Sequence, residues 1–175
     1  MKKFIPLLIL VLSYSSYGQV IGVNLDLKSS YTATPDVGEW VPNEGFYQSI
    51  SIGGVYSMEM SEKLNLEAGV SIGRIIQDTD AGVPELLGVS TIAKYYLSEA
   101  FSLKGGFAFT YRMEGKNDIR KRGALSTSLG VGWDITEKFV LSTGFILPLT
   151  NSSKAEGAIR DYSVGFSLEY FFFTF

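Results

Sequence analysis

The sequence predicts an all-β protein, an eight-stranded antiparallel up-and-down transmembrane β-barrel. Three observations lead to this prediction. Bulky apolar residues alternate with small or polar residues, with a period of two, along eight segments of the 175-residue chain. The connections between these segments are alternately short and long. The residues opposite the bulky apolar face are mostly Gly, Ser and Ala, which suit a crowded lumen better than a solvated sheet surface.

The first 18 residues have the pattern of a secretory signal peptide. Positively charged Lys2 and Lys3 precede an apolar run at 4–13, which is shorter than the roughly 18 apolar residues that a membrane anchor needs. Small residues, Ser16 and Gly18, then precede Gln19, as at a cleavage site. The site contains no Cys, so a lipoprotein anchor is excluded. We therefore expect a signal peptide at 1–18 and a barrel domain at 19–175.

The first alternating segment of the expected barrel sets the pattern for the other seven. Ile21, Val23, Leu25 and Leu27 fall on one face, and the residues between them are small or polar. The expected strands cover residues 20–28, 46–58, 64–75, 86–97, 101–112, 124–135, 139–149 and 162–172. Their lengths fit the roughly 9–11 tilted residues that cross a bilayer as a strand.

The connections indicate how the barrel is oriented in a membrane. Those at 59–63, 98–100 and 136–138 are short and polar, and those at 29–45, 77–85, 113–123 and 150–161 are longer. Outer-membrane barrels have short periplasmic turns and long outer loops. We therefore expect the long loops outside the cell and both chain termini in the periplasm.

The composition excludes several classes of function. The chain contains neither Cys nor His, which removes disulfides, thiolate metal sites, the usual zinc enzymes and Ser-His-Asp hydrolases. The net charge is −3, and the only strongly basic run is at 120–122. We therefore expect a non-enzymatic protein with no cofactor, no metal site and no nucleic-acid partner.

The bulky face carries aromatic residues close to the short turns, where they would form a girdle at the periplasmic interface of the membrane. This predicted girdle consists of Tyr56, Tyr95, Phe101, Trp133, Phe139 and Tyr170. The alternative is a secreted soluble barrel or sandwich, in which the same bulky face would line a ligand cavity.

The opposite face carries charged residues that would project into the lumen. They are Asp26, Lys28, Glu67, Lys94, Lys104, Arg112, Asp134 and Glu169. Counting from the turn near Glu99 places Lys94 opposite Lys104, with Glu67 on the other neighbouring strand of Lys94. Because adjacent lysines repel, we expect Glu67, Asp134 and Glu169 to offset their charge. The network is either a static plug or a gate that rearranges to pass small solutes. Eight strands leave little room for water, which favours the plug.

The signal peptide, the eight segments, the stretch AKYYLSEAFSLKGGFAF at 93–109 and the terminal Phe175 resemble the small outer-membrane β-barrel domain family. The architecture is similar to the eight-stranded transmembrane domain of OmpA and to OmpX. The resemblance implies residence in the outer membrane of a Gram-negative bacterium, contact with lipid and lipopolysaccharide, and a monomer. It also implies that the last strand, ending at Phe175, presents a C-terminal signal to the barrel assembly machinery. Strict alternation would place Thr174 rather than Phe175 on the lipid face, so a register shift or bulge is expected there.

Overall fold

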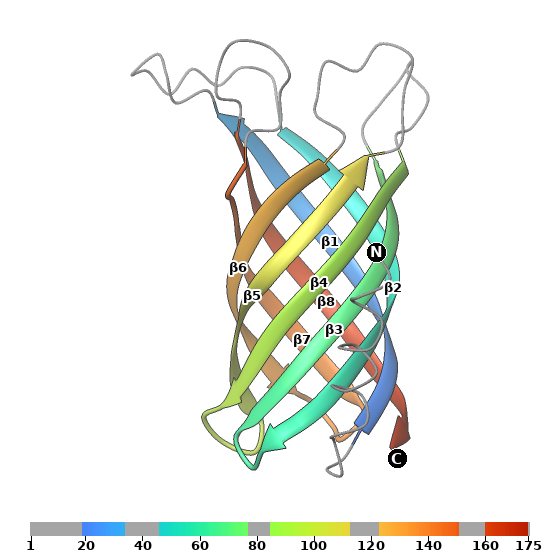
Figure 1. Ribbon diagram of the computed structural model, residues 1–175, viewed down its shortest axis with the longest axis vertical. Coiled ribbons are helices and arrows are strands. Elements are labelled where there is room, and N and C mark those ends of the chain that lie inside the picture. Colours follow the sequence, from blue (N-terminus) through green and yellow to red (C-terminus); the bar gives the residue numbers. More distant parts are fainter. Residues whose placement is uncertain (1–18, 34–45, 77–84, 113–122, 151–159, 175) are drawn as a thin grey trace, which may run out of the picture.

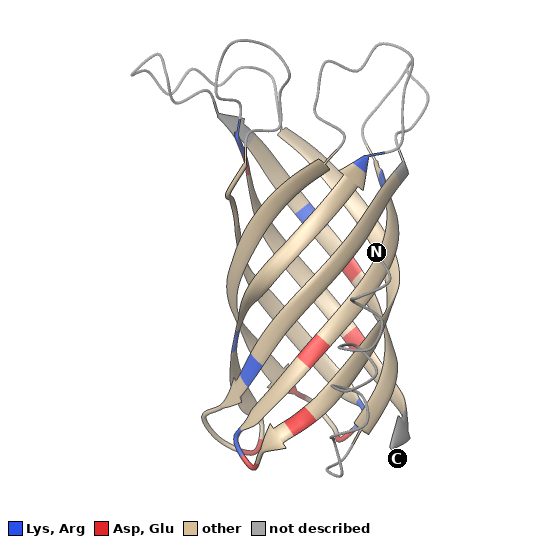
Figure 2. Ribbon diagram, in the orientation of Figure 1, with Lys and Arg blue, Asp and Glu red and all other residues tan. Residues whose placement is uncertain are grey.

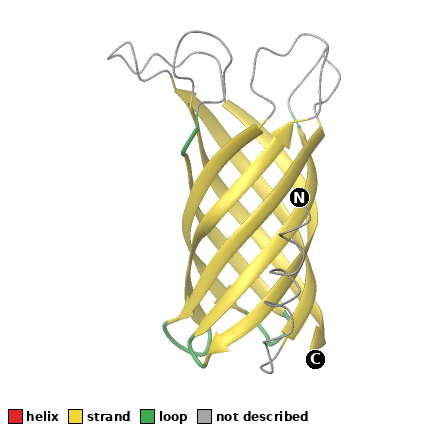
Figure 3. Ribbon diagram, in the orientation of Figure 1, coloured by secondary structure: helices red, strands yellow, loops and turns green. Residues whose placement is uncertain are grey.

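A computed structural model of the protein describes residues 19–33, 46–76, 85–112, 123–150 and 160–174. The predicted signal peptide at 1–18 and the terminal Phe175 lie outside these residues. Figure 3 shows that the described part of the chain consists of strands joined by loops. Within it, no helix has the length and apolar character needed to cross a membrane.

The described residues form eight strands, close to the eight predicted segments. They are β1 (Gln19–Ala33), β2 (Phe46–Ser61), β3 (Leu64–Ile75), β4 (Glu85–Tyr96), β5 (Phe101–Arg112), β6 (Gly123–Asp134), β7 (Phe139–Pro148) and β8 (Arg160–Thr174).

The strands close into a barrel in chain order, because β1 pairs with β2 on one side and with β8 on the other. All the pairings are antiparallel, so the predicted eight-stranded up-and-down barrel is confirmed. Figure 1 shows the three short turns, the start of β1 and the end of β8 at the bottom of the barrel. We call this the turn end, and the opposite end, where the strands lead into the long connections, the loop end.

Three strands extend by more than one residue beyond the predicted segments. β1 continues to Ala33 and β8 begins at Arg160, so the predicted loop boundaries at 29 and 161 were wrong. The added residues of β1 pair with residues 160–164 of β8, and the hydroxyls of Ser30 and Ser163 are 2.8 Å apart. The polar stretch at 29–33 lacks bulky apolar alternation, which is why the sequence did not indicate it. β2 likewise continues to Ser61, so only 62–63 remain for its turn.

The other two short turns contain the same side-chain hydrogen bond. The amide of Phe101 donates to Ser98 Oγ at 3.1 Å, and the amide of Phe139 donates to Thr136 Oγ1 at the same distance. In each turn a hydroxyl thus satisfies the first amide of the following strand. This similarity reflects the sequences Ser-Glu-Ala-Phe at 98–101 and Thr-Glu-Lys-Phe at 136–139.

Most of the bulky apolar residues on the strands face outward and are exposed. Along β4 and the residue that follows it they lie between Leu87 and Leu97, and on β5 between Phe101 and Tyr111, which matches the roughly 9–11 residues of a transmembrane strand. Figure 2 shows few charged residues along the strands. Among the outward side chains that the structure describes on the strands, charged residues occur only near the loop end, at Arg74 and Arg160.

Two threonine hydroxyls within this apolar surface donate hydrogen bonds to the backbone. Thr127 Oγ1 donates to the carbonyl of Gly106 at 2.9 Å, and Thr143 Oγ1 donates to the carbonyl of Gly165 at 3.0 Å. A side chain that satisfies its donor on a neighbouring strand can face hydrocarbon without losing a hydrogen bond to water.

Inward glycines allow close approach of neighbouring strands. Gly130 and Gly144 are Cα partners on β6 and β7. A Cβ on Gly144 would lie 2.7 Å from the Leu129 carbonyl oxygen and 2.8 Å from Gly130 Cα, and both of these are backbone atoms. Glycine is therefore required at this point of the inner face for a steric reason.

The seam between β1 and β8 contains an irregularity near its turn end. Gly22 pairs with Phe171 and the preceding Ile21 pairs with Phe173, so Phe172 is an extra residue in β8. This is a register shift of the kind that the sequence predicted for the end of the last strand. Beyond it, Thr174 pairs with Val20, which leaves Phe175 outside the described residues.

Candidate functional site

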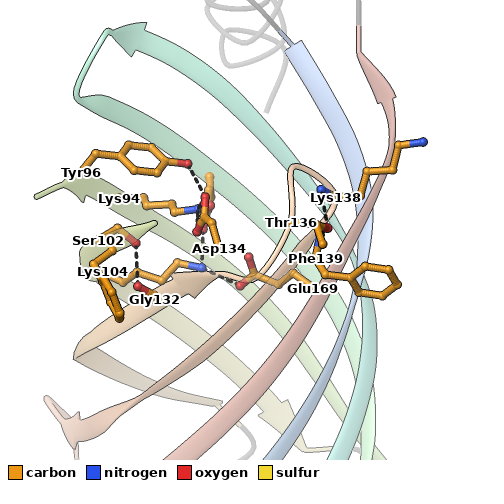
Figure 4. A network of polar contacts seen from close by, with 12 residues as sticks. Lys94, Tyr96, Ser102, Lys104, Gly132, Asp134, Thr136, Lys138, Phe139 and Glu169 are labelled. Carbon is orange, nitrogen blue, oxygen red and sulfur yellow. Dashed lines mark hydrogen bonds and ion pairs between the residues drawn. The ribbon is translucent and has the colours of Figure 1, made fainter. Parts of the chain in front are cut away.

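A network of buried charges crosses the lumen near the turn end (Figure 4). Lys94 on β4 extends to Asp134 on β6, and its Nζ lies 2.8 and 2.9 Å from the two carboxylate oxygens. The hydroxyl of Tyr96 donates to Asp134 Oδ2 at 3.0 Å. The Lys94 Nζ also lies 4.7 Å from the centre of the Tyr96 ring. These three residues form a compact unit with balanced charge.

Lys104 on β5 is the centre of the second part of the network. Its Nζ lies 2.6 Å from Glu169 Oε1 on β8 and 3.0 Å from Glu67 Oε2 on β3. One ammonium thus joins two carboxylates that come from different sides of the barrel. All three side chains are at least nine-tenths buried, with relative exposures of 8%, 7% and 3% in the order Lys104, Glu169 and Glu67.

The strand register explains how these groups meet. Lys94 and Lys104 are Cα partners, as counting from their turn indicated. The partner of Lys94 on β3 is Asn65, and Glu67 lies two residues further along that strand. Glu67 therefore binds Lys104 rather than Lys94. Asp134 takes the other lysine, so the two ammonium groups are held apart by separate acidic partners.

The charges in the network do not balance. Two lysines face three carboxylates, and two buried oxygens, Glu67 Oε1 and Glu169 Oε2, have no hydrogen-bond partner among the described residues. Leaving buried acceptors unsatisfied is costly. Removing one of the two lysine charges is therefore expected to destabilise the barrel strongly.

Apolar side chains fill part of the lumen near the turn end. Val55, Val140 and Phe171 are buried and form one cluster, against which Val20 packs. Val140 is the Cα partner of both Asp134 and Glu169, so the cluster lies directly beside the charge network. The sequence analysis missed this cluster. Its signal was the occurrence of bulky residues at inward positions that elsewhere carry Gly or Ser.

Above the network, the lumen holds a cavity of about 280 Å³. Glu67, Lys104 and Glu169 line it toward the turn end, and Arg112 lines it toward the loop end. Its wall is rich in serine hydroxyls, among them Ser49, Ser51, Ser71, Ser90, Ser126, Ser128, Ser163 and Ser167.

Asp26 and Lys28 lie on the wall of this cavity, on β1. Asp26 Oδ2 accepts hydrogen bonds from Asn24 Nδ2 at 2.9 Å and from Ser51 Oγ at 3.2 Å. The structure thus places five of the eight predicted lumen residues, Glu67, Lys94, Lys104, Asp134 and Glu169, in one network. It places Asp26, Lys28 and Arg112 apart from the network, on the wall.

The residues of the predicted girdle lie in the half of the barrel nearest the turn end, on the outer face. Tyr95, Phe101, Trp133 and Phe139 are exposed, and Tyr56 and Tyr170 are partly buried. Several of them pack together across strands. Phe101 and Trp133 stack with ring centres 6.2 Å apart, and Phe139 and Tyr170 contact at 4.7 Å. Aromatic pairs of this kind stabilise neighbouring strands.

The described residues contain no group of three or more His, Cys, Asp or Glu side chains arranged to hold a metal ion.

Comparison with known proteins defines the class of this fold. No family model matches the chain, and no curated protein matches it. Solved structures do match. Neisserial surface protein A superposes with a TM-score of 0.58 and 11% identity, covering 87% of this chain and 97% of the other.

The attachment invasion locus protein Ail of Yersinia pestis gives a TM-score of 0.55 at 13% identity, covering 89% and 99% of the two chains. A second structure of Ail, in complex with the heparin analogue sucrose octasulfate, gives a TM-score of 0.54 at the same identity and coverage. The chain therefore has the fold of the small eight-stranded outer-membrane β-barrels. At these identities the likeness concerns the fold.

Proposed function

We propose that the protein is an integral β-barrel of the Gram-negative outer membrane with a closed lumen, and that it acts as a structural or surface-contact protein without enzymatic activity. The observation that carries this proposal is the combination of an apolar exposed belt with a lumen blocked at the turn end. The belt suits lipid, because a soluble protein rarely exposes such a large continuous apolar surface. The blocked lumen suits a role in which no solute crosses.

The charge network and the apolar cluster together support closure. The network spans from β3 to β8, and the apolar cluster spans the neighbouring sector formed by β1, β2, β7 and β8. Both are held by contacts that a passing solute would have to break, and breaking a buried ion pair is costly. We therefore favour a plug over a channel.

The orientation and the partners follow from the same proposal. The turn end would face the periplasm and the loop end the exterior, as in other outer-membrane barrels. Lipid and lipopolysaccharide would surround a monomer. The assembly machinery would recognise the last strand, with Phe175 as its terminal signal. The names of the similar structures, a surface protein and an attachment protein, support a surface-contact role for the outer loops.

The membrane proposal is tested by expressing the chain in a Gram-negative host and fractionating its envelope. The outer-membrane fraction is run on SDS gels with and without boiling. We expect a band that shifts on boiling, because a closed barrel resists SDS until it is heated. A soluble periplasmic band without a shift would contradict the proposal and favour a secreted β-protein.

A narrow pore is the second candidate function. It is favoured by the position of Lys104 between two carboxylates, since an ammonium with two alternative partners can move with little loss of pairing. Planar-bilayer recordings separate the two candidates. The plug predicts no steady conductance. The pore predicts a steady conductance that Lys104→Glu alters and that Lys63→Glu, an exposed change in the turn at 62–63, leaves unchanged.

A further inference from the structure

We propose that the lumen cavity binds a small zwitterion, a solute that carries one ammonium group and one carboxylate a few carbon atoms apart. The site is formed by Asp26 and Lys28 on the inner wall of β1. This inference goes beyond the proposed function and depends only on the closed barrel and its cavity.

The first reason is that Asp26 and Lys28 carry charges without charged partners among the described residues. Asp26 accepts hydrogen bonds from Asn24 and Ser51, both of which are neutral. Neither Asp26 nor Lys28 forms an ion pair with any of the residues in the described ranges. Both are partly buried and line the cavity. A charge that is withdrawn from water favours an opposite charge nearby. The five charged residues of the network at the turn end, by contrast, each form at least one ion pair.

The second reason is the spacing of the two groups. Residues two apart on a strand point to the same side and are separated by roughly 6.5–7 Å. An ammonium placed beside Asp26 and a carboxylate placed beside Lys28 would therefore be several ångströms apart in one molecule. That separation fits an ω-amino acid in an extended conformation better than two separate ions.

The third reason is the size and shape of the space. The cavity volume of about 280 Å³ lies near the lower limit of ligand pockets, which begin at roughly 300 Å³, so it suits only a small solute. Apolar atoms of the cavity wall could pack against the methylene groups of such a solute. A Cβ on Gly165 would lie 3.6 Å from Ile146 Cδ1 and 3.7 Å from Lys28 Cγ, so the Ile146 side chain approaches the stem of Lys28.

The turn end determines from which side a solute would reach the pocket. Because the charge network and the apolar cluster block the lumen on that side, a solute would enter and leave from the loop end. The pocket would therefore bind a solute without passing it through the barrel.

The test is an NMR titration of the full chain, refolded in detergent micelles, with 4-aminobutanoate as the probe. Butylamine and butanoate serve as matched probes that carry only one of the two charges. We expect saturable amide shifts along β1 around Asp26 and Lys28, and binding at least about tenfold weaker for each single-charge probe.

Three variants and one control locate the site. Asp26→Asn and Lys28→Met should each weaken 4-aminobutanoate binding about tenfold or more, whereas Lys138→Met, which removes an exposed charge in a turn, should not. Gly165→Leu keeps both charges but fills the space beside Lys28, and should also abolish binding. Retention of the gel shift on boiling shows that each variant is folded.

Three results would overturn the proposal. One is the absence of saturable shifts in the parent protein. Another is equal binding of 4-aminobutanoate and butylamine, which would indicate a general cation effect. The third is unchanged binding in folded Asp26→Asn and Lys28→Met proteins. The gel-shift experiment on the envelope does not depend on any of these results, so a failed pocket and a failed membrane assignment are distinguishable.

Discussion

Replacing Lys104 by methionine tests how the lumen is held together. Methionine keeps most of the length of the side chain and removes its charge, so Glu67 and Glu169 would lie in the lumen without the cation between them. The two contacts of 2.6 and 3.0 Å each correspond to about 6 kcal/mol of Coulomb attraction at an effective dielectric constant near 20. Removing the buried ammonium recovers several kcal/mol of its desolvation cost, which offsets part of this loss.

The expected net effect is a loss of about 3–5 kcal/mol in the free energy of unfolding, because two buried carboxylates are left uncompensated. Lys94→Met should cost less, about 1–3 kcal/mol, since the Asp134 side chain is 18% exposed and keeps the hydroxyl of Tyr96. Lys63→Met, at an exposed turn position, should change the free energy by no more than about 0.5 kcal/mol.

The assay is urea unfolding of protein reconstituted in lipid vesicles, followed by far-ultraviolet circular dichroism and by the gel shift on boiling. The test is the order of the stability losses in the three variants, with Lys104→Met the largest and Lys63→Met the smallest. If Lys104→Met lost less than about 1 kcal/mol, or lost no more than Lys63→Met, the network would not stabilise the barrel and the plug argument would fail. Restoration of stability in Lys104→Met by Glu67→Gln and Glu169→Gln together would show that the loss came from uncompensated charge.

Three further predictions concern packing and the membrane face. Gly144→Ala should cost about 1–3 kcal/mol, because its Cβ meets backbone on β6, whereas Gly54→Ala adds a methyl in open space and should cost at most about 0.5 kcal/mol; equal effects in urea unfolding would contradict the steric argument. Val89→Arg on the apolar belt should destabilise the membrane-inserted barrel by about 2–4 kcal/mol and Tyr95→Arg near the turn end by about 0–1 kcal/mol. No depth dependence in refolding into vesicles would contradict a membrane-facing belt. Val140→Ala should cost about 1–3 kcal/mol, since Val140 is only 2% exposed, and a neutral result in the same assay would mean that the apolar cluster packs loosely.

Much of the fold could be predicted from the sequence, because successive residues of a barrel strand face the outside and the lumen in turn and differ in type accordingly. The eight segments, their short turns and the Lys94–Lys104 pairing all follow from period-two alternation and from counting outward from a turn. The extension of β1 to Ala33 could not be predicted, because residues 29–33 do not alternate between bulky apolar and polar types and their strand is defined by pairing with β8.

The charged residues of the candidate site could be predicted from the sequence, but the ion pairs between them could not. Inward charges were identifiable from alternation alone. Which carboxylate meets which lysine depends on the tilt of the strands and on the reach of side chains across the lumen, and these bring Glu169 on β8 to Lys104 on β5. Distant strands of this kind have no sequence relationship that a register count could use. The apolar cluster was missed for a related reason, since Val55, Val140 and Phe171 become one group only when the barrel closes.

The seam between β1 and β8 has a consequence for the time course of folding. Val20 pairs with Thr174, so residues from opposite ends of the chain must meet before either terminal strand has both of its neighbours. Contacts so distant along the chain are slow to form. Until the last strand arrives, the first strand presents an open edge beside a row of exposed apolar residues, which is the arrangement most prone to aggregation. Such a chain has to be protected from its own copies between synthesis and insertion, and its last strand determines when that protection can end.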